Sequence, residues 1–211
     1  MNVWMPQGTV YGTLLNFRRE WDLWAPRMTQ DPHKAPPQAP VLYVKSANTF
    51  APAGQDLLLQ DGVQEVDIGA TLGLVIGARA QLAGAALLLD WSVPHSSYYR
   101  PPVKFRCRDG FLGLPTQPSA CAPDAHWDNL RIEVRCNQAL VQTVDLRELV
   151  RSVPQLLADV GEFMTLQPGD VLMVGTDCLP GGTRPRARAG DTVALSAAGL
   201  QPVHTHVKGL A

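Results

Sequence analysis

The segment from residue 95 to residue 116, HSSYYRPPVKFRCRDGFLGLPT, concentrates tyrosine, arginine and lysine among residues that favour turns. Such a composition is typical of a loop that lines a binding site. Its cations Arg100, Lys104 and Arg108 are suited to bind the carboxylates of a small anionic ligand. The alternative is that each of them pairs with a carboxylate on the protein surface, and the sequence leaves both interpretations open.

Two histidines, His204 and His206, form a His-x-His pattern near the end of the sequence. Alternate residues of a strand lie on one face, so both imidazoles could bind one metal ion. No third ligand is evident, and we expect the pair to lie in an exposed tail. The sequence contains no Gly-x-Ser-x-Gly, P-loop or Gly-x-Gly-x-x-Gly pattern, which argues against the enzyme classes that depend on them.

Most of the chain has the pattern of short strands separated by turns. Runs rich in β-branched and aliphatic residues predict strands over 10–17, 41–45, 63–77, 87–92, 171–176 and 190–199. LRIEVRCN and QALVQTVDL predict a hairpin that turns near Asn137. Asp90 is the single carboxylate near the end of the run LLLDWS. The strands predict an α+β chain that is rich in β-structure.

Two segments have helical patterns. Over 17–28, Phe17, Trp21 and Trp24 recur at helical spacing, and Pro26 predicts the end of that helix. Over 153–164, Ser152 can cap the helix and Gln155 completes a capping box. We therefore expect few helices, each with one apolar face.

The composition excludes several classes of protein. With 211 residues, 45% of them hydrophobic, the chain can form one domain over 1–211, with 1–10 as an N-terminal arm. The 18 Lys and Arg balance 19 Asp and Glu, so nucleic acid and anionic membranes are not expected partners. There is no apolar run long enough to span a bilayer and no signal-peptide pattern. The four cysteines are widely spaced, so we expect reduced thiols and a cytoplasmic protein.

The order of several motifs along the chain resembles that of the fumarylacetoacetate hydrolase family. The segments are LLNFRRE, PVLYVKS, DIGATLGLVIG, LLLDWS, RCRDGF, FMTLQPGDVLMVGT and AGDTVAL, spread over about residues 10–200. The resemblance implies a β-rich fold, a mixed β-sheet roll or sandwich with few helices, which is often dimeric. SYYRPPVKFRCRDGF is most similar to the family branch that isomerises and decarboxylates intermediates of 4-hydroxyphenylacetate (homoprotocatechuate) catabolism.

The resemblance also implies a Mg²⁺ or Mn²⁺ site built from a Glu-x-Glu pair and a later Asp. The matching positions are Gly69, Thr71 and Asp90, so only the third ligand is present. Glu65 and Asp67 share the strand face of the lost pair, but each two-residue step moves a side chain about 6.6 Å along the strand. We expect metal to be absent or weakly bound at Asp90, with Glu65 and Asp67 at a solvated strand entry.

Other family positions bear on substrate and mechanism. Glu20 and Leu23 occupy the places of the family's lid His and Glu, so the dyad that activates water for hydrolysis is missing. Lys45, Arg106 and Thr176 match substrate-side positions. The resemblance therefore favours Asp90, Arg106 and Lys45 as catalytic residues, and Lys104, Arg100, Arg108 and Thr176 as residues that bind substrate.

The implied chemistry is decarboxylation of 5-oxopent-3-ene-1,2,5-tricarboxylate and isomerisation of 2-hydroxyhepta-2,4-diene-1,7-dioate, both through an enolate. If the chain acts alone, Arg106 and Lys45 would stabilise the oxyanion and Asp90 would carry the proton. Alternatively, the chain is a catalytically silent subunit that stabilises or completes a metal-bearing sister subunit. The sequence favours neither, and it leaves a homodimer and a heteromer equally open.

Overall fold

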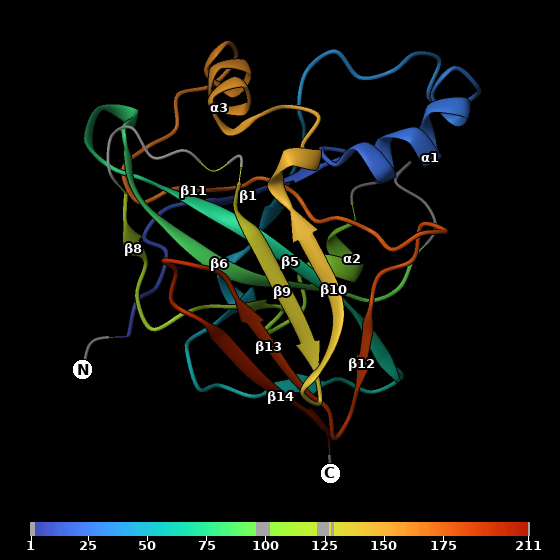
Figure 1. Ribbon diagram of the computed structural model, residues 1–211, viewed down its shortest axis with the longest axis vertical. Coiled ribbons are helices and arrows are strands. Elements are labelled where there is room, and N and C mark those ends of the chain that lie inside the picture. The colour runs from blue at the N-terminus through green and yellow to red at the C-terminus, as the bar shows by residue number, and fades with distance from the viewer. Residues whose placement is uncertain (1–2, 96–101, 122–126, 128, 211) are drawn as a thin grey trace.

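Two β-sheets form the body of the protein. The structure, a computed structural model, describes residues 3–95, 102–121, 127 and 129–210. The larger sheet has nine strands in the order β2-β1-β11-β5-β6-β7-β3, with β12 paired to β5 and β8 to β6. The smaller sheet has five strands in the order β10-β9-β13-β14-β4 (Figure 1). The prediction of a β-rich mixed fold with few helices is confirmed.

The strands of the larger sheet are β1 (Val10–Leu14), β2 (Val41–Lys45), β3 (Phe50–Ala51), β5 (Glu65–Ile76), β6 (Leu82–Ser92), β7 (Leu112–Gly113), β8 (Ser119–Ala120), β11 (Val171–Met173) and β12 (Arg186–Arg188). Those of the smaller sheet are β4 (Leu57–Leu59), β9 (Arg131–Cys136), β10 (Ala139–Asp145), β13 (Thr192–Ser196) and β14 (Val203–Gly209). The helices are α1 (Arg18–Met28), α2 (Val103–Arg106) and α3 (Val153–Gly161), with single 3₁₀ turns at Ala47–Thr49, Ala78–Ala80 and Leu146–Glu148.

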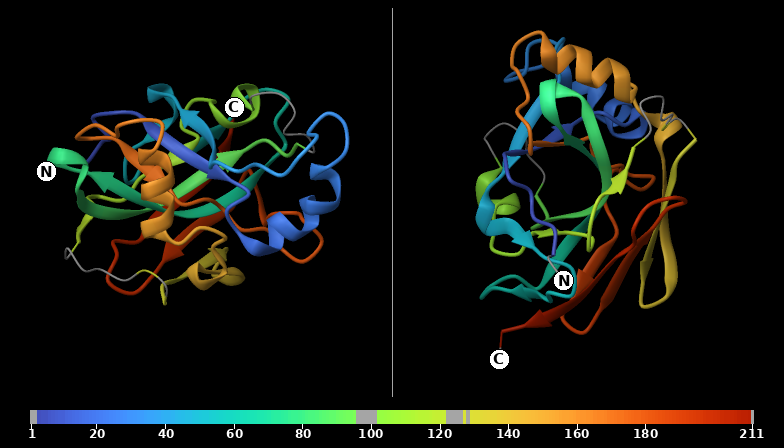
Figure 2. Two further views of the ribbon diagram at one scale, coloured as in Figure 1. Left: turned by 90° about the horizontal axis from the view of Figure 1, so that it is seen from above. Right: turned by 90° about the vertical axis from the view of Figure 1, so that its left-hand side faces the viewer.

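The long antiparallel pair β5–β6 is buried on both faces. Successive side chains of a strand face opposite ways, and β6 illustrates this: Leu87 and Leu89 pack into one apolar cluster, whereas Ala86 and Leu88 pack into another. The first cluster fills the space between the two sheets. The second lies inside the larger sheet, which curls into a roll (Figure 2, right). Burial on both faces explains the nearly continuous apolar sequence of these strands.

Helix α3 begins at the predicted Ser152 cap, but the predicted capping box is not completed, because the Gln155 side chain donates to Asp159 Oδ1 at 2.5 Å. The Ser152 side chain accepts a hydrogen bond from the backbone N–H of Gln155 at 3.5 Å, and Leu156 and Val160 are buried against the core between the sheets. The helix ends at Gly161, three residues before the predicted end. Met164 still packs against the same core from the following turn.

Helix α1 differs from its prediction in length and in the face that it buries. It continues through Pro26 to Met28. Pro26 cannot bond the carbonyl of Asp22, but both residues are exposed, so water can satisfy that carbonyl. The buried residues of the helix are Glu20 and Met28, while Trp21 and Trp24 are only half-buried. The helix therefore presents a carboxylate, not an aromatic stripe, to the interior.

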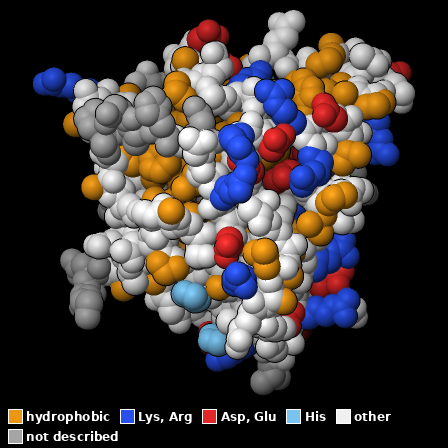
Figure 3. Space-filling model, in the orientation of Figure 1, with side chains coloured by type: hydrophobic (Ala, Val, Ile, Leu, Met, Phe, Trp, Pro, Cys, Tyr) orange, Lys and Arg blue, Asp and Glu red, His pale blue; other side chains and the backbone are white. Residues whose placement is uncertain are grey.

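The surface of the protein agrees with the nearly equal numbers of acidic and basic residues in the sequence. Basic and acidic side chains are interspersed on the face shown in Figure 3.

The residues before β1 lie against the roll, where the N–H of Gly8 donates to the carbonyl of Gly169 at 3.0 Å. All four cysteines are free thiols. No helix within the described part of the chain is both long and apolar enough to cross a membrane.

Candidate functional site

Three predicted site residues meet in one buried ion cluster, which we define as Lys45, Asp90, Arg106 and Tyr43. Lys45 Nζ lies 3.0 Å from Asp90 Oδ1, and Arg106 Nη1 lies 2.8 Å from Asp90 Oδ2. The hydroxyl of Tyr43 donates a hydrogen bond to the same Oδ2. The lysine and the aspartate are 1% exposed and the arginine 2%, so water is nearly excluded from the cluster.

Different parts of the chain bring the cluster together. Tyr43 and Lys45 are alternate residues of β2 and share a strand face. Asp90 lies near the end of β6, and Arg106 is the last residue of the short helix α2. Tyr43 pairs with Gly12 on β1, where an added Cβ would lie 2.0 Å from the tyrosine ring. A glycine at position 12 is thus required for the ring to enter the roll.

Burial and the neighbouring charges shift the pKa values of the residues in this buried ion cluster. Burial alone would raise the pKa of Asp90, but the nearby Lys45 and Arg106 outweigh it and hold the pKa below its ordinary value. Burial and the adjacent Asp90 carboxylate raise the pKa of Tyr43 well above its ordinary value. Burial lowers the pKa of Lys45, against the opposing effect of Asp90. Asp90 is therefore a carboxylate that accepts hydrogen bonds from Tyr43 and Arg106 on one oxygen and forms an ion pair with Lys45 through the other.

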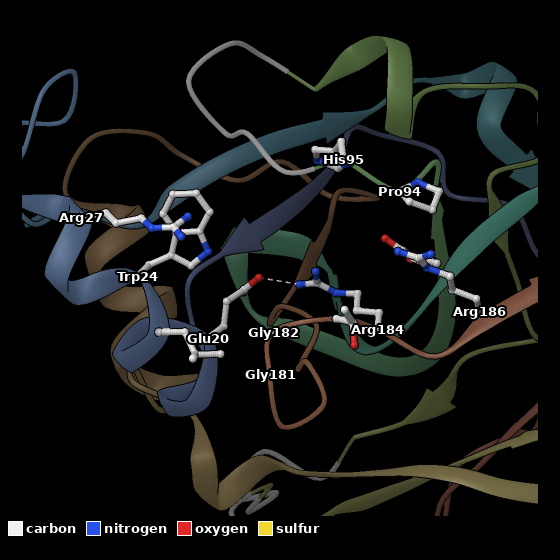
Figure 4. A pocket seen from close by; sticks show the side chains of 12 residues that line it. Glu20, Trp24, Arg27, Pro94, His95, Gly181, Gly182, Arg184 and Arg186 are labelled. Atoms are coloured by element: carbon white, nitrogen blue, oxygen red, sulfur yellow. Dashed lines mark hydrogen bonds and ion pairs between the residues drawn. The ribbon is translucent and has the colours of Figure 1, made fainter.

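A cleft opens beside α1, and none of the residues of the buried ion cluster lines it. Its volume is about 560 Å³, within the range of small-molecule sites. Its walls come from α1, from the loop that precedes β12, and from the ends of β5 and β6 (Figure 4). The residues that line it are Glu20, Leu23, Trp24, Arg27, Asp67, Pro94, His95, Gly181, Gly182, Thr183, Arg184 and Arg186.

Arg184 forms the polar centre of this cleft. Its Nη2 donates to Glu20 Oε1 at 2.7 Å, and its Nε donates to Thr176 Oγ1 at 3.2 Å. Both charged side chains are less than a tenth exposed. A second ion pair, between Arg19 and Asp177 at 3.0 Å, also joins α1 to the segment that follows β11. Thr176 thus contributes to the cleft through an arginine that sequence reasoning missed.

Arg186 and His95 line the opposite side of the cleft. Arg186 donates through Nε to Asp67 at 3.0 Å and through Nη1 to Glu65 at 2.5 Å. Glu65 and Asp67 were expected at a solvated strand entry; instead both are ion-paired across β5 and β12, which lie in register there. Burial raises the pKa of Asp67 and lowers that of His95, whose ring stacks on Phe105 at 4.9 Å.

A sequence signal for these cleft arginines exists. The segment GGTRPRAR at 181–188 places arginines at alternate positions, which on a strand directs them to one side. The two flanking glycines, Gly181 and Gly182, both have positive φ angles, 96° and 89°, and so form the turn that returns the chain to the cleft.

Of the remaining predicted binding residues, Lys104 and Arg108 join neither group. Lys104 is exposed on α2, and Arg108 donates to Gln60 Oε1 at 2.8 Å, on the segment between β4 and β5. Arg100 lies outside the described residues. The recorded partners of Arg108 are the Gln60 amide oxygen and the Lys104 carbonyl, not the surface carboxylate of the alternative, and its role in binding stays a prediction.

The His-x-His pair lies on a strand and not in a tail. His204 and His206 are exposed on β14, alternating with buried Val203, Thr205 and Val207. The strand pairs with β13 and β4, which keeps it in the sheet. The prediction of a tail is therefore wrong. No group of three or more His, Cys, Asp or Glu side chains that could hold a metal ion occurs among the described residues.

Comparison with known proteins identifies the family. The family model for the C-terminal domain of fumarylacetoacetate (FAA) hydrolase matches residues 9–208. The chain belongs to the fumarylacetoacetate hydrolase family.

Two curated members of the family are similar to nearly the whole chain. The 4-hydroxyphenylacetate degradation bifunctional isomerase/decarboxylase of Salmonella dublin is 36% identical over 95% of this chain and 47% of its own length. The homoprotocatechuate catabolism bifunctional isomerase/decarboxylase of Escherichia coli is 33% identical over the same shares. The chain thus spans about half the length of these relatives.

A solved fumarylacetoacetate hydrolase family structure has the same fold. Fumarylpyruvate hydrolase from Pseudomonas aeruginosa, in complex with Mn²⁺ and pyruvate, superposes with a TM-score of 0.76 at 21% identity. The superposition covers 96% of this chain and 90% of that one. At this identity the similarity establishes the fold alone.

The metal site of the fumarylacetoacetate hydrolase family does not fit the residues that occupy it here. Gly69 pairs with Asp90 across β5 and β6, and an added Cβ at Gly69 would lie 2.4 Å from the carbonyl oxygen of Asp90. Thr71 is buried, with its hydroxyl directed to the backbone of Leu72 at 3.4 Å. Both oxygens of Asp90 already face cations. No divalent ion can therefore take three carboxylates at these positions without a change in the backbone.

Proposed function

We propose that this chain is the metal-free member of an isomerase/decarboxylase of 4-hydroxyphenylacetate catabolism, and that a metal-bearing chain or half of the same family carries the chemical step. The supporting observation is the buried ion cluster: Lys45 and Arg106 lie against both oxygens of Asp90, where the family would bind its ion. A carboxylate so paired and buried is not an open ligand, and loss of its partners would leave an uncompensated buried charge.

The lengths of the relatives support the proposal that a second half of the enzyme carries the metal. Each curated isomerase/decarboxylase is about twice as long as the part that this chain matches. In the proposal, the unmatched half corresponds to the metal-bearing partner, and the substrates are 5-oxopent-3-ene-1,2,5-tricarboxylate and 2-hydroxyhepta-2,4-diene-1,7-dioate. The reactions pass through an enolate, whose developing negative charge requires electrostatic stabilisation.

Independent catalysis by this chain has a steric obstacle. Lys45 and Arg106 would have to reach the enolate oxygen, but they are 1% and 2% exposed and are paired with Asp90. Direct catalytic roles for these three residues stay predictions. If the chain alone turns over substrate, the Arg106→Ala and Asp90→Asn variants test these roles, because an unchanged rate in both would remove these side chains from the mechanism.

Calorimetry and turnover of the chelator-treated chain test the proposed function. Mg²⁺ and Mn²⁺ are titrated with and without oxalate, a mimic of an oxo-acid enolate. We expect no binding in the micromolar range and no turnover by the chain alone. Mixing it with a family chain that carries Glu-x-Glu and Asp should raise the activity or the stability of that chain above its value alone. Metal-dependent turnover by this chain in isolation would disprove the proposal.

A further inference from the structure

A second pocket lies beside β14 and shares no lining residue with the cleft beside α1. Its volume is about 510 Å³. The polar residues that line it are Gln55, Asp56, Thr116, Gln201, His204 and His206. Among the described residues of this lining, Asp56 is the only one with a permanent charge, and no lysine or arginine is present. The pocket is therefore better suited to a cation than to an anion.

His204 and His206 stand on the same face of β14 and both line the pocket. Strand β4 pairs with β14 only over Val207–Gly209, so the two histidines lie before that ladder begins. Side chains two residues apart on a strand start about 6.6 Å apart, and two nitrogens of a tetrahedral ion lie about 3.4 Å apart. Both residues are exposed, so their rings can rotate toward each other and close this difference.

Thr192 positions the ring of His206. The two residues are partners across β13 and β14, and Thr192 Oγ1 lies 3.0 Å from His206 Nδ1. When Nδ1 carries the proton, it donates to the hydroxyl, and the lone pair of Nε2 is available to a metal ion. Histidines that bind metals usually have such a hydrogen-bond partner on the other ring nitrogen. This contact is therefore an observation that points to a ligand beyond the spacing of the pair.

We infer that His204 and His206 bind one late first-row transition ion, Ni²⁺, Cu²⁺ or Zn²⁺, in the pocket beside β14. Imidazole nitrogens suit these ions, whereas Mg²⁺ prefers oxygen ligands. Water and the amide oxygens of Gln55 and Gln201 can occupy the remaining positions. Asp56 is paired with Lys208 at 2.5 Å and is not counted as a ligand. The inference goes beyond the proposed function and does not depend on it.

Calorimetric titration of the untagged chain with Ni²⁺ and Zn²⁺, after treatment with a chelator and its removal, tests this inference. We expect one ion per chain, and excess Mg²⁺ should not displace it. His204→Gln and His206→Gln should each weaken the affinity at least about tenfold. His33→Gln, at an exposed position outside the pocket, should leave it unchanged. Absence of binding at millimolar concentrations, or unchanged affinity in both pocket variants, would overturn the inference.

Two further variants separate this site from other groups that bind metals. Thr192→Val keeps the branched side chain but removes the contact with His206 Nδ1, and should weaken the affinity about tenfold. An unchanged affinity would refute the positioning role of Thr192. Cys107→Ser removes a free thiol and should have no effect. A loss of binding in Cys107→Ser with normal binding in His204→Gln would assign the ion to the thiol and refute the histidine site.

The histidine site and the proposed function can fail separately. Mn²⁺ is the most weakly bound ion of the first-row series, so Ni²⁺ binding at the histidines does not predict turnover that depends on Mn²⁺. Ni²⁺ binding that is lost in His204→Gln supports the site whatever the chain does with Mn²⁺ and oxalate. Turnover with Mg²⁺ or Mn²⁺ that persists in His204→Gln would refute the proposed function alone.

Discussion

The ammonium nitrogen of Lys45 lies 3.0 Å from Oδ1 of Asp90, and both side chains are completely buried. An internal cation thus faces the carboxylate that the family resemblance matches to a metal ligand. Arg106 faces the other oxygen of the same carboxylate at 2.8 Å. The two ion pairs make Asp90 part of the buried interior, and the consequences of this pairing can be measured.

Removal of the central charge should cost the most stability. Asp90→Asn keeps the shape of the side chain but leaves Lys45 and Arg106 buried without their counter-ion. Loss of one partner from a buried ion pair costs about 3–5 kcal/mol, and we expect a loss of this size in urea unfolding. Asp22→Asn, at an exposed position of α1, serves as the control and should change little. A loss below about 1 kcal/mol for Asp90→Asn would mean that the pairs are weak.

The same carboxylate should contribute to acid sensitivity. The pKa of Asp90 is lowered in the folded protein, so the unfolded chain binds more protons below the ordinary value of 3.8. Its contribution to stability is complete above that pH and is lost as the pH falls toward the folded pKa. Urea midpoints between about pH 5 and pH 2.5 should fall less steeply in Asp90→Asn than in the wild type. Parallel curves would show that Asp90 does not contribute.

Restoration of a side chain at Gly69 should damage the roll. An added Cβ would lie 2.4 Å from the Asp90 carbonyl oxygen and 2.9 Å from Thr176 Cγ2, so the backbone must shift. We expect Gly69→Ala to lower the free energy of unfolding by about 1–3 kcal/mol. Gly161→Ala is the matched control, because nothing lies within 4 Å of its added Cβ. Equal stabilities of the two variants would show that β5 accommodates a side chain at position 69.

The attachment of α1 should depend on one buried ion pair. Glu20→Gln removes the carboxylate that Arg184 contacts at 2.7 Å, and the arginine is then left buried without that charge. Amide exchange should become faster in α1 while that of α3, which lies outside the cleft, stays the same. Asp22→Asn on the same helix should leave both rates unchanged. A uniform increase across the protein would instead indicate global destabilisation.

Local sequence patterns predicted the strands and helices of this protein more closely than they predicted its tertiary contacts. The turn of the predicted hairpin forms at Asn137 and Gln138, both with positive φ, and the Ser152 cap starts α3 where expected. Pro26 does not end the helix as predicted, because the carbonyl that it leaves without a partner lies on an exposed part of the helix. The length of a strand or helix depends on such solvation, which a local pattern does not contain.

Residue types predicted only part of the candidate functional site. Lys45, Asp90 and Arg106 were chosen together, but they were expected to face a ligand and instead pair with one another. Arg184 and Arg186 were not chosen, although their alternate spacing was visible. Which charges face solvent and which pair internally depends on burial, and burial is a property of the folded sheet.

The sequence by itself determined the family and the β-rich pattern, and it puts Gly69 and Thr71 where the resemblance expects the Glu-x-Glu pair, because these depend on residue identity and order. Only the tertiary structure decided that Lys45 and Arg106 meet at Asp90, and that Arg27 lies across a cleft from Arg186. Those residues are far apart in the chain. Lys45, Asp90 and Arg106 meet because the curled larger sheet encloses a nearly dry interior, in which a charged side chain is stable only beside an opposite charge.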